Sequence, residues 1–347
     1  MPDGTLAPAV LASACDGLVF SHDDGPGITR RGAGRGFAYY DAKGRLIRDP
    51  DVVDRIHKLA IPPAWTDVWI SPSPRGHIQA VGRDAKGRKQ YRYHDQWSAG
   101  RAETKYARLA AFGRALPKLR ERVEQDLGKR GPSRDKVLAT AVRLLEISLI
   151  RVGNKEYARQ NHSFGLTTLH KRHIDVDGAA LALHFVGKSG VEQRVSVRDR
   201  RLARVVQSLQ DLPGQRLFKY RGDDGELAPI DSSDVNGYIR ETMGDDFSAK
   251  DFRTWAATVS AARALCLEPA PESAAAAKRT STQAIKAVAA ILGNTPTVCR
   301  SSYIHPAVLD AFAEGRLADA FPDPEDEGFE KALIAFLESC ADRAKAA

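Results

Sequence analysis

Lys250-Asp251-Phe252-Arg253-Thr254-Trp255 begins a segment of helical spacing in which Phe252, Trp255 and Val259 fall on one apolar face. Arg253 stands between these apolar positions, so we expect packing on both sides to fix its backbone. The pattern indicates that this half of the chain is mainly α-helical.

Helical patterns cover most of the chain beyond residue 98. Apolar residues recur at helical spacing between residues 109 and 119, and Ser133 is expected to cap a second helix, which Gly153 should end. A short β region is expected at 174–176, 181–186 and 191–197, and further helices near 198–210, 231–243, 250–267, 273–292 and 296–315. The acidic stretch Asp323 to Glu327 is interpreted as a solvated linker before a last helix.

The first 97 residues predict short strands joined by turns. The aromatic run Phe37 to Tyr40, the turn Asp41-Ala42-Lys43-Gly44 and the return Arg45-Leu46-Ile47 together predict a hairpin. Further strands are expected at 68–70, 77–81 and 89–93, with a second turn at Asp84-Ala85-Lys86-Gly87 and a helix at 50–60. The predicted fold class is therefore α+β. A small, mainly antiparallel β domain at 1–97 precedes a larger, mainly α-helical domain at 98–347.

Composition points to a polyanionic partner. Lysine and arginine number 52 against 44 acidic residues, a formal charge of +8, which favours DNA or RNA. The four cysteines show no C-x-x-C spacing, so we expect reduced thiols in a cytoplasmic protein. No apolar run approaches the roughly 18 residues of a membrane helix, and no signal peptide is expected.

Common cofactor and metal motifs are absent from the sequence. No G-x-x-x-x-G-K-[ST] pattern supports a P-loop, and Gly32, Gly34 and Gly36 precede a strand instead of opening a helix after one. His170 and His173 lack a carboxylate cluster that would complete a metal site. We therefore expect a protein that works without cofactor or metal.

A set of cations and a tyrosine remains. Arg151 ends a helical stretch, Lys188 lies in the turn of a probable hairpin, and Asn294 and Tyr303 occur in Gly293-Asn294-Thr295-Pro296 and Ser301-Ser302-Tyr303-Ile304-His305-Pro306. Taken singly, each residue is more often structural: an arginine bound to helix-end carbonyls, an exposed lysine, a half-buried tyrosine. These residues alone support only a basic, two-part protein that could bind nucleic acid.

Several ordered motifs resemble the type IB DNA topoisomerases of poxviral and bacterial type. The resemblance runs from about residue 23 to about residue 315. It is carried by Asp24-Gly25-Pro26-Gly27-Ile28-Thr29-Arg30, Ile61-Pro62-Pro63-Ala64-Trp65, Gly82-Arg83-Asp84 with Lys86-Gly87-Arg88-Lys89-Gln90-Tyr91, the Lys250 to Trp255 stretch, and Ser302-Tyr303-Ile304-His305-Pro306.

The resemblance implies a catalytic set. Arg151, Lys188 and Arg253 fall on the family's Arg, Lys and Arg, and Tyr303 falls on its nucleophile. Asn294, nine residues before Tyr303, stands where poxviral enzymes carry histidine. An amide can hydrogen-bond a phosphoryl oxygen but cannot act as a general acid or base. Lys188 is expected to protonate the departing 5′-oxygen, and Lys250 is a second candidate for proton transfer.

The same resemblance implies that a basic hairpin contacts duplex DNA in the major groove. Its expected DNA-binding residues are Arg83, Lys86, Arg88, Lys89, Gln90, Tyr91 and Tyr93. Tyr91 and Tyr93 should point together, because alternate residues of a strand share a face. The glutamine amide could read adenine.

The implied activity is ATP-independent relaxation of supercoiled DNA through a 3′-phosphotyrosyl intermediate. We expect a monomeric, nucleoid-associated cytoplasmic enzyme that prefers supercoiled duplex. Two alternatives remain at this point: a tyrosine site-specific recombinase, which shares the Arg, Lys, Arg, Tyr chemistry, and a non-catalytic DNA-binding protein of the same fold. Asp251, two residues before Arg253, argues against the recombinase, which normally has histidine there.

Overall fold

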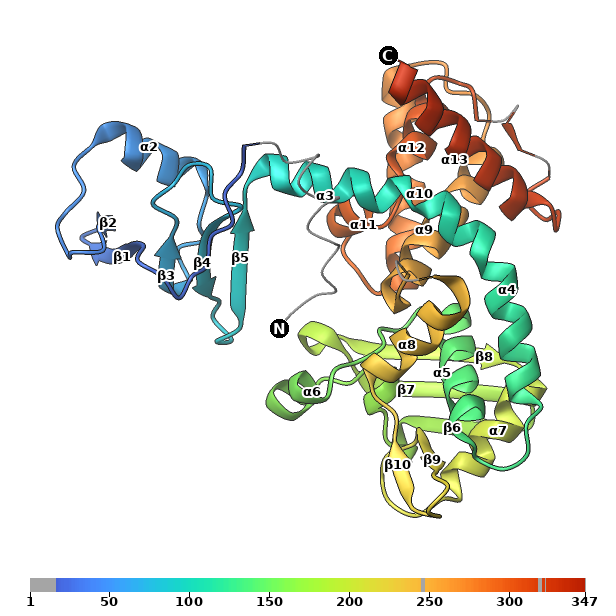
Figure 1. The fold of residues 1–347 in the computed structure, drawn as a ribbon. Helices are drawn as coiled ribbons and strands as arrows, with labels where there is room; N and C mark the ends of the chain where they lie inside the picture. Colours follow the sequence, from blue (N-terminus) through green and yellow to red (C-terminus); the bar gives the residue numbers. More distant parts are fainter. Residues whose placement is uncertain (1–16, 245–246, 318–319, 322, 347) are drawn as a thin grey trace. The chain divides into compact units, whose positions relative to one another are not determined.

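The computed structural model describes residues 17–244, 247–317, 320–321 and 323–346. The chain forms two compact units, which divide after Tyr106 (Figure 1). The first unit is built on an antiparallel sheet and the second is mainly helical, as the α+β assignment predicts. None of the described helices is long and apolar enough to cross a membrane.

The N-terminal unit holds a five-stranded sheet in the order β2-β1-β3-β4-β5. Its strands are β1 (Ile28–Ala33), β2 (Gly36–Tyr40), β3 (Thr66–Ile70), β4 (Ile78–Arg83) and β5 (Lys89–Tyr93). Helix α2 (Pro50–Lys58) packs Ile56 into the core formed by Tyr39, Val68 and Ile70. Helix α3 (Asp95–Ala107) follows the sheet. β4 and β5 form the predicted hairpin across the second turn, and β5 is an edge strand.

The hairpin expected at residues 37–47 is short. Across its turn, Tyr40 bridges Leu46, and the backbone N–H of Ile47 donates to the carbonyl of Tyr39 at 2.8 Å. On its other side the aromatic run pairs along its whole length with β1, from Thr29 opposite Tyr40 to Ala33 opposite Gly36. The tight connection between β1 and β2 contains Gly34 at φ +58°, a conformation that glycine adopts without steric cost.

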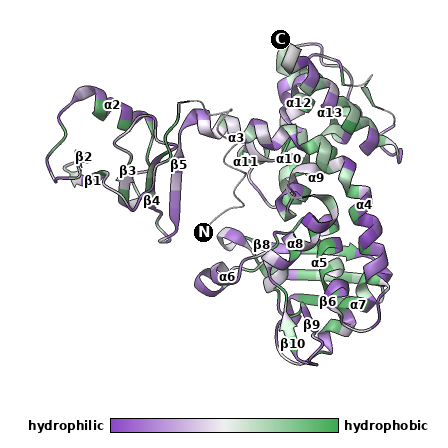
Figure 2. Ribbon diagram, viewed as in Figure 1, coloured by the Kyte–Doolittle hydropathy of each residue, from purple (hydrophilic) through white to green (hydrophobic). Residues whose placement is uncertain are grey.

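The C-terminal unit has a large hydrophobic core, to which the buried helices α5 (Arg134–Ser148) and α9 (Ala249–Cys266) contribute (Figure 2). The other helices are α4 (Leu109–Leu127), α6 (Lys155–Asn161), α7 (Arg200–Gln210), α8 (Ser232–Met243), α10 (Ala274–Leu292), α11 (Pro296–Ser302), α12 (Pro306–Ala313) and α13 (Phe329–Ala346). An antiparallel sheet comprises β6 (Ile174–Asp177), β7 (Ala180–Val186) and β8 (Glu192–Arg198), and β9 (Lys219–Arg221) pairs with β10 (Leu227–Pro229). Single 3₁₀ turns occur at Leu166–Thr168, Lys171–His173 and Lys188–Gly190.

Two predicted helix ends are corrected by the structure. Ser133 caps α5 as expected, but the helix ends at Ser148 instead of Gly153, because Leu149 takes a left-handed conformation at φ +55°. The helix expected at 296–315 is two helices, α11 and α12, separated at Tyr303. Pro306 causes this break, since proline has no N–H for the preceding turn and holds His305 in an extended conformation. Helix α6 and the β9–β10 hairpin were not anticipated from the sequence.

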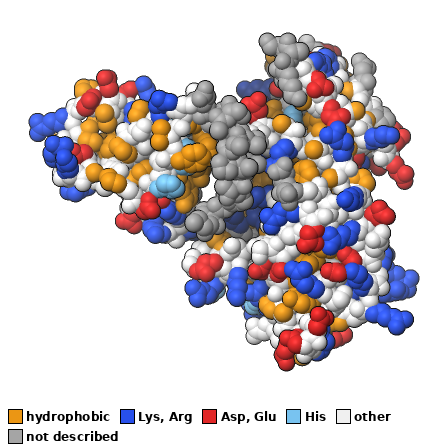
Figure 3. Space-filling view, in the orientation of Figure 1, with side chains coloured by type: hydrophobic (Ala, Val, Ile, Leu, Met, Phe, Trp, Pro, Cys, Tyr) orange, Lys and Arg blue, Asp and Glu red, His pale blue; other side chains and the backbone are white. Residues whose placement is uncertain are grey.

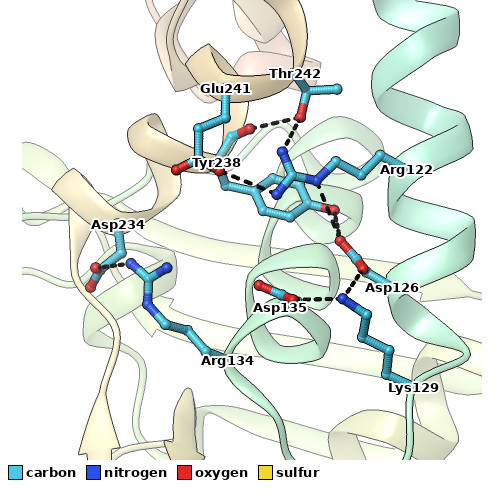
Figure 4. A network of polar contacts seen from close by, with 9 residues as sticks. All are labelled: Arg122, Asp126, Lys129, Arg134, Asp135, Asp234, Tyr238, Glu241 and Thr242. Atoms are coloured by element: carbon cyan, nitrogen blue, oxygen red, sulfur yellow. Dashed lines mark hydrogen bonds and ion pairs between the residues drawn. The ribbon is translucent and has the colours of Figure 1, made fainter.

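A polar network joins α4 to α8 (Figure 4). The buried Tyr238 hydroxyl donates to Asp126 Oδ2 at 2.7 Å, and Lys129 Nζ lies 2.6 Å from the same carboxylate. Arg122 lies 4.1 Å over the Tyr238 ring and donates to Thr242 Oγ1 at 2.6 Å. Burial acts to raise the pKa of Asp126, but hydrogen bonds from Lys129 and Tyr238 outweigh it and lower the pKa below its usual value.

We predict that Asp126→Asn lowers the free energy of unfolding at neutral pH by about 1.5–3 kcal/mol, because a buried charge-assisted hydrogen bond is lost. A folded-state pKa below the unfolded value of about 3.9 stabilises the fold above that pH, and this contribution is lost as pH falls through the folded pKa. Urea denaturation at neutral and acidic pH should therefore show the variant's deficit shrinking in acid. Asp135→Asn, at the exposed partner of Lys129, is the matched control and should cost less; equal costs would contradict the prediction.

Candidate active site

Tyr303 lies at the break between α11 and α12, as the C-cap of α11, and its ring is partly buried. The buried Thr258 of α9 holds this break in place. Its Oγ1 lies 3.3 Å from the carbonyl oxygen of Tyr303 and accepts a hydrogen bond from the backbone N–H of His305 at 3.1 Å. The backbone that leaves the tyrosine is therefore tied to α9.

Arg253 projects from the first turns of α9 and is 5% exposed. Its two terminal nitrogens donate to the carbonyl of Leu149, at the end of α5, and to that of Leu292, at the end of α10, the latter at 2.8 Å. Carbonyls at helix C-termini lack intrahelical partners and carry partial negative charge, so they suit a buried guanidinium. Nε of Arg253 has no hydrogen-bond partner among the described residues.

The Arg253 guanidinium carbon lies 5.2 Å from the centroid of the Tyr303 ring. Burial acts to raise the pKa of the Tyr303 phenol, but the charge and hydrogen bond of Arg253 and the charge of Arg151 outweigh it and lower the pKa. Burial, with Arg151 nearby, lowers the pKa of Arg253 from its ordinary value, while the phenol acts to raise it. The site therefore favours the phenolate, the nucleophilic form of tyrosine.

Arg151 and Asn294 come from separate loops and contact each other. Nη2 of Arg151 donates to Oδ1 of Asn294 at 2.7 Å. This contact fixes the amide with Nδ2 as its free donor, and Nδ2 is buried without a hydrogen bond of good geometry among the described residues. Its dipole nevertheless favours the ionised form of Tyr303. A neutral, oriented donor thus stands beside two cations and a phenol.

The structure does not bring the two lysines into this group. Lys188 is exposed in the turn between β7 and β8, and its side chain makes no hydrogen bond or ion pair with any described residue. Gln193 of β8 does pack against Gly293, next to Asn294, so the base of this hairpin adjoins the site. Lys250 is exposed in the first turn of α9.

In the N-terminal unit, the hairpin of β4 and β5 carries the predicted DNA-binding set. Tyr91 and Tyr93 point together as expected, with ring centroids 5.8 Å apart and planes inclined by 14°. Lys89 pairs with Asp23 at 2.6 Å and lies 5.5 Å from the Tyr91 ring centroid. The strand thus presents an aromatic pair and a cation on the same face, features suited to a nucleic acid.

Asp84 organises the opposite face of this hairpin. Its carboxylate binds Arg88 at 2.7 Å and accepts from the Gln90 amide at 2.9 Å. Arg83 donates to the carbonyl of Gly87 at 3.0 Å, and Lys86 is exposed. Lys and Arg side chains are spread over the visible surface of both units, interspersed with acidic groups (Figure 3).

Sequence reasoning did not single out Thr258 or Asp84 as site residues. A threonine in a buried helix and an aspartate in a turn are common structural features, so neither carries a signal without its partners. Within the described part of the chain, no cluster of three histidine, cysteine or acidic residues could hold a metal ion.

Two family models match this chain. The model described as the catalytic core of eukaryotic DNA topoisomerase I matches residues 94–317, and that of the bacterial DNA topoisomerase IB N-terminal domain matches residues 36–84. The chain is 34% identical to the DNA topoisomerase 1B of Acanthamoeba polyphaga mimivirus over 293 residues, 82% of this chain and 87% of the viral protein. It is 22% identical to the DNA topoisomerase 1B of vaccinia virus (strain Copenhagen) over 265 residues, 76% and 81% of the two chains. It is 24% identical to the DNA topoisomerase 1 of rabbit fibroma virus (strain Kasza) over 297 residues, 80% and 89% of the two chains.

We predict that Arg151→Gln raises the pKa of Tyr303, because removing a nearby cation disfavours the phenolate. The nine tyrosines can be labelled with ¹³C at the ring carbon that bears the hydroxyl and titrated by NMR, with Tyr303→Phe assigning the signal. Arg159→Gln, an exposed charge removal on α6, is the control and should leave the Tyr303 pKa in place. An unchanged pKa in Arg151→Gln would refute this account of the site.

We also predict that Thr258→Val lowers the free energy of unfolding by about 1–3 kcal/mol, since the buried N–H of His305 loses its acceptor while side-chain volume is kept. Chemical denaturation measures this. Thr282→Val, at a partly exposed threonine of α10 whose hydroxyl donates to the Lys278 carbonyl of the same helix, should change stability by less. Similar values for the two variants would show that the hydroxyl does not hold the break.

Proposed function

Because this chain belongs to the type IB DNA topoisomerase family, we propose that it relaxes supercoiled duplex DNA by cutting one strand, allowing rotation and resealing the break. The observation that carries this function is the grouping of Tyr303, Arg253, Arg151 and Asn294. A partly buried phenol beside two guanidiniums is equipped to attack a phosphodiester. Isomerase activity on DNA is thus the conclusion for this protein.

In the proposed reaction, the phenol oxygen of Tyr303 attacks a backbone phosphorus and the bond to the 5′-oxygen breaks. The phenol gives up its proton as the new O–P bond forms, and the leaving 5′-oxygen takes one up, so the products are a 3′-phosphotyrosyl link and a strand that ends in a 5′-hydroxyl. Resealing is the reverse attack of that hydroxyl, with release of the phenol. One phosphodiester is exchanged for another in each direction, so no ATP is consumed.

Arg253 and Arg151 supply positive charge where the phosphoryl oxygens gain negative charge. Nε of Arg253 and Nδ2 of Asn294 are buried donors on side chains that lie beside Tyr303, and we propose that they bind these oxygens. Asn294 contributes a dipole without a proton to give, so proton transfer must come from elsewhere.

Lys188 is proposed as the acid that protonates the leaving 5′-oxygen, with Lys250 as a second contributor. The turn that carries Lys188 contains Gly190 at φ +76° and Ser189 at φ +70°, and its lysine is not held by other side chains of the described chain. We propose that bound DNA brings this turn to the site. A lysine can serve as an acid when neighbouring cations lower its pKa.

The N-terminal domain, assigned to residues 1–97 from the sequence, is proposed to hold the duplex through its β4–β5 hairpin. The stacked Tyr91 and Tyr93 and the Lys89 ammonium support this role. Preference for supercoiled substrate, a monomeric state and a nucleoid-associated, cytoplasmic location complete the proposal.

A tyrosine recombinase is not favoured. Asp251, where such an enzyme normally has histidine, is engaged in capping α9, accepting from the backbone N–H of Ser248 at 2.8 Å. A carboxylate committed to a helix cap cannot replace an imidazole that binds phosphate. Relaxation of plasmid without magnesium, ATP or paired sites distinguishes the topoisomerase from a recombinase.

We predict that Tyr303→Phe abolishes relaxation, with a loss of about 10⁴-fold or more, because no other group supplies the nucleophile. The wild type, quenched with denaturant during reaction with DNA, should yield a covalent protein–DNA adduct on a gel, and the variant none. Tyr157→Phe, which removes a phenol on α6, is the matched control and should keep full activity. Salt-sensitive DNA binding by the wild type without any adduct would instead support a non-catalytic protein.

A further inference from the structure

The pentapeptide Asp-Ala-Lys-Gly-Arg occurs twice in the N-terminal unit, at 41–45 and at 84–88. The two copies form the same turn. Oδ1 of Asp41 accepts from the backbone N–H groups of Lys43 and Arg45, both at 2.9 Å, and Oδ2 accepts from Nε of Arg45 at 2.9 Å.

In the second copy, Oδ1 of Asp84 accepts from the N–H groups of Lys86 at 2.9 Å and Arg88 at 3.0 Å, and Oδ2 accepts from Nε of Arg88 at 2.8 Å. The repeated sequence therefore builds the same local structure in two places. Any functional difference must come from the residues that surround each turn.

The difference lies two residues beyond each arginine. Position 47 is Ile47, whose side chain packs against the sheet core, whereas position 90 is Gln90, whose Nε2 donates to Oδ2 of Asp84 at 2.9 Å. The carboxylate of the second turn thus accepts one more hydrogen bond, and its donor is one of the proposed DNA-contacting residues. The closing of the turn does not require it, since the first copy forms without it.

Asp84 determines which end of the Gln90 amide is available. Hydrogen bonds from Arg88, followed by those from Lys86 and Gln90, overcome the effect of burial and lower the pKa of Asp84 to about 2. The ionised carboxylate only accepts hydrogen bonds, so the amide must turn its NH₂ group toward it. Oε1, which accepts no hydrogen bond from the described chain, and the second N–H of Nε2 then remain for another partner.

Gln90 stands where this pair can be presented. It lies on the edge strand β5 and is partly exposed; its paired residue in β4 is Gly82, and the Trp65 side chain lies over that glycine. An acceptor and a donor side by side on one amide match the N6 amino group and N7 of adenine in the major groove. A freely rotating amide would present either order of donor and acceptor, whereas the fixed amide presents one.

We propose that Asp84 is a positioning residue that fixes the Gln90 amide and thereby sets a preference for adenine in the bound duplex. This inference rests on the proposed DNA-relaxing function and adds a determinant of its sequence preference. The test replaces Asp84 by asparagine, because Oδ1 is retained for the turn while Oδ2 becomes an NH₂ group that can no longer accept from Gln90 or Arg88.

The experiment measures binding to a pool of random-sequence duplexes, with sequencing of the bound fraction at fixed salt. The wild type should enrich adenine at one position, and Asp84→Asn should reduce that enrichment about fivefold or more. Asp41→Asn is the matched control. It removes the equivalent charge from the other copy of the turn and should leave the enrichment unchanged. Denaturation midpoints for both variants verify that the turns still form.

A double variant separates action through Gln90 from action through Arg88. In a Gln90→Ala background, Asp84→Asn should have no further effect on base preference. The proposal is overturned if the wild type shows no adenine enrichment, if Asp84→Asn retains it, if Asp41→Asn reduces it equally, or if the effect persists without Gln90.

Plasmid relaxation by the wild type is measured separately and reports on the proposed function. If the wild type relaxes plasmid while Asp84→Asn keeps the adenine enrichment, the role of Asp84 fails and the function stands. If the wild type does not relax plasmid, the function fails, and binding to the pool still decides whether Asp84 positions Gln90.

Discussion

The contact of Arg253 with two helix C-termini is the interaction on which the site depends. Its guanidinium binds the carbonyls of Leu149 and Leu292, and each of these residues lies two positions before another member of the site, Arg151 or Asn294. The arginine therefore sets the spacing of the loops that carry its partners, while its flat face lies near Tyr303. A lysine could not replace it, because a single ammonium cannot span two carbonyls and also lie against a ring in this fixed, planar geometry. The side chain is thus structural and electrostatic at once.

Tyr303, the proposed nucleophile, lies at an interruption of helical structure. Pro306 ends the run that α11 begins, and Tyr303 occupies the interruption, where the backbone N–H and C=O groups that a continuous helix would use need other partners. Thr258 meets this need from α9, the same helix that carries Arg253. Tyr303 and Arg253 are consequently both held by α9, so their relative position does not depend on a long loop. Lys188, the proposed acid, differs from them because it lies on an exposed turn.

The positive charge of the site comes from Arg253 and Arg151, so the residue at position 294 can be a neutral asparagine. The two guanidiniums and the Asn294 amide together outweigh the effect of burial on the Tyr303 phenol and lower its pKa, which suits the proposed role of this tyrosine as nucleophile. Asn294 needs only to be oriented, and Arg151 orients it by occupying its oxygen. In the N-terminal unit, the carboxylate of Asp84 orients the Gln90 amide in the same manner, by accepting a hydrogen bond from its nitrogen. In both cases a charged partner removes the freedom of an amide to present either end.

The sequence by itself predicted the α+β class and most helices and strands, and it marked Tyr303, Arg253, Arg151 and Asn294, which the structure brings together. Periodicity of apolar residues reports which segments bury a face, and the ordered motifs around Arg253 and Tyr303 are specific because several occur together. It did not determine where α5 ends or which strand pairs with residues 37–40, since a left-handed Leu149 and the choice of a sheet partner are decided by packing across the unit. The sequence also could not distinguish the identical turns at 41–45 and 84–88. Only the tertiary structure distinguishes them, because Asp84 accepts an additional hydrogen bond from the Gln90 side chain. Contacts between side chains depend on which residues the paired strands bring together.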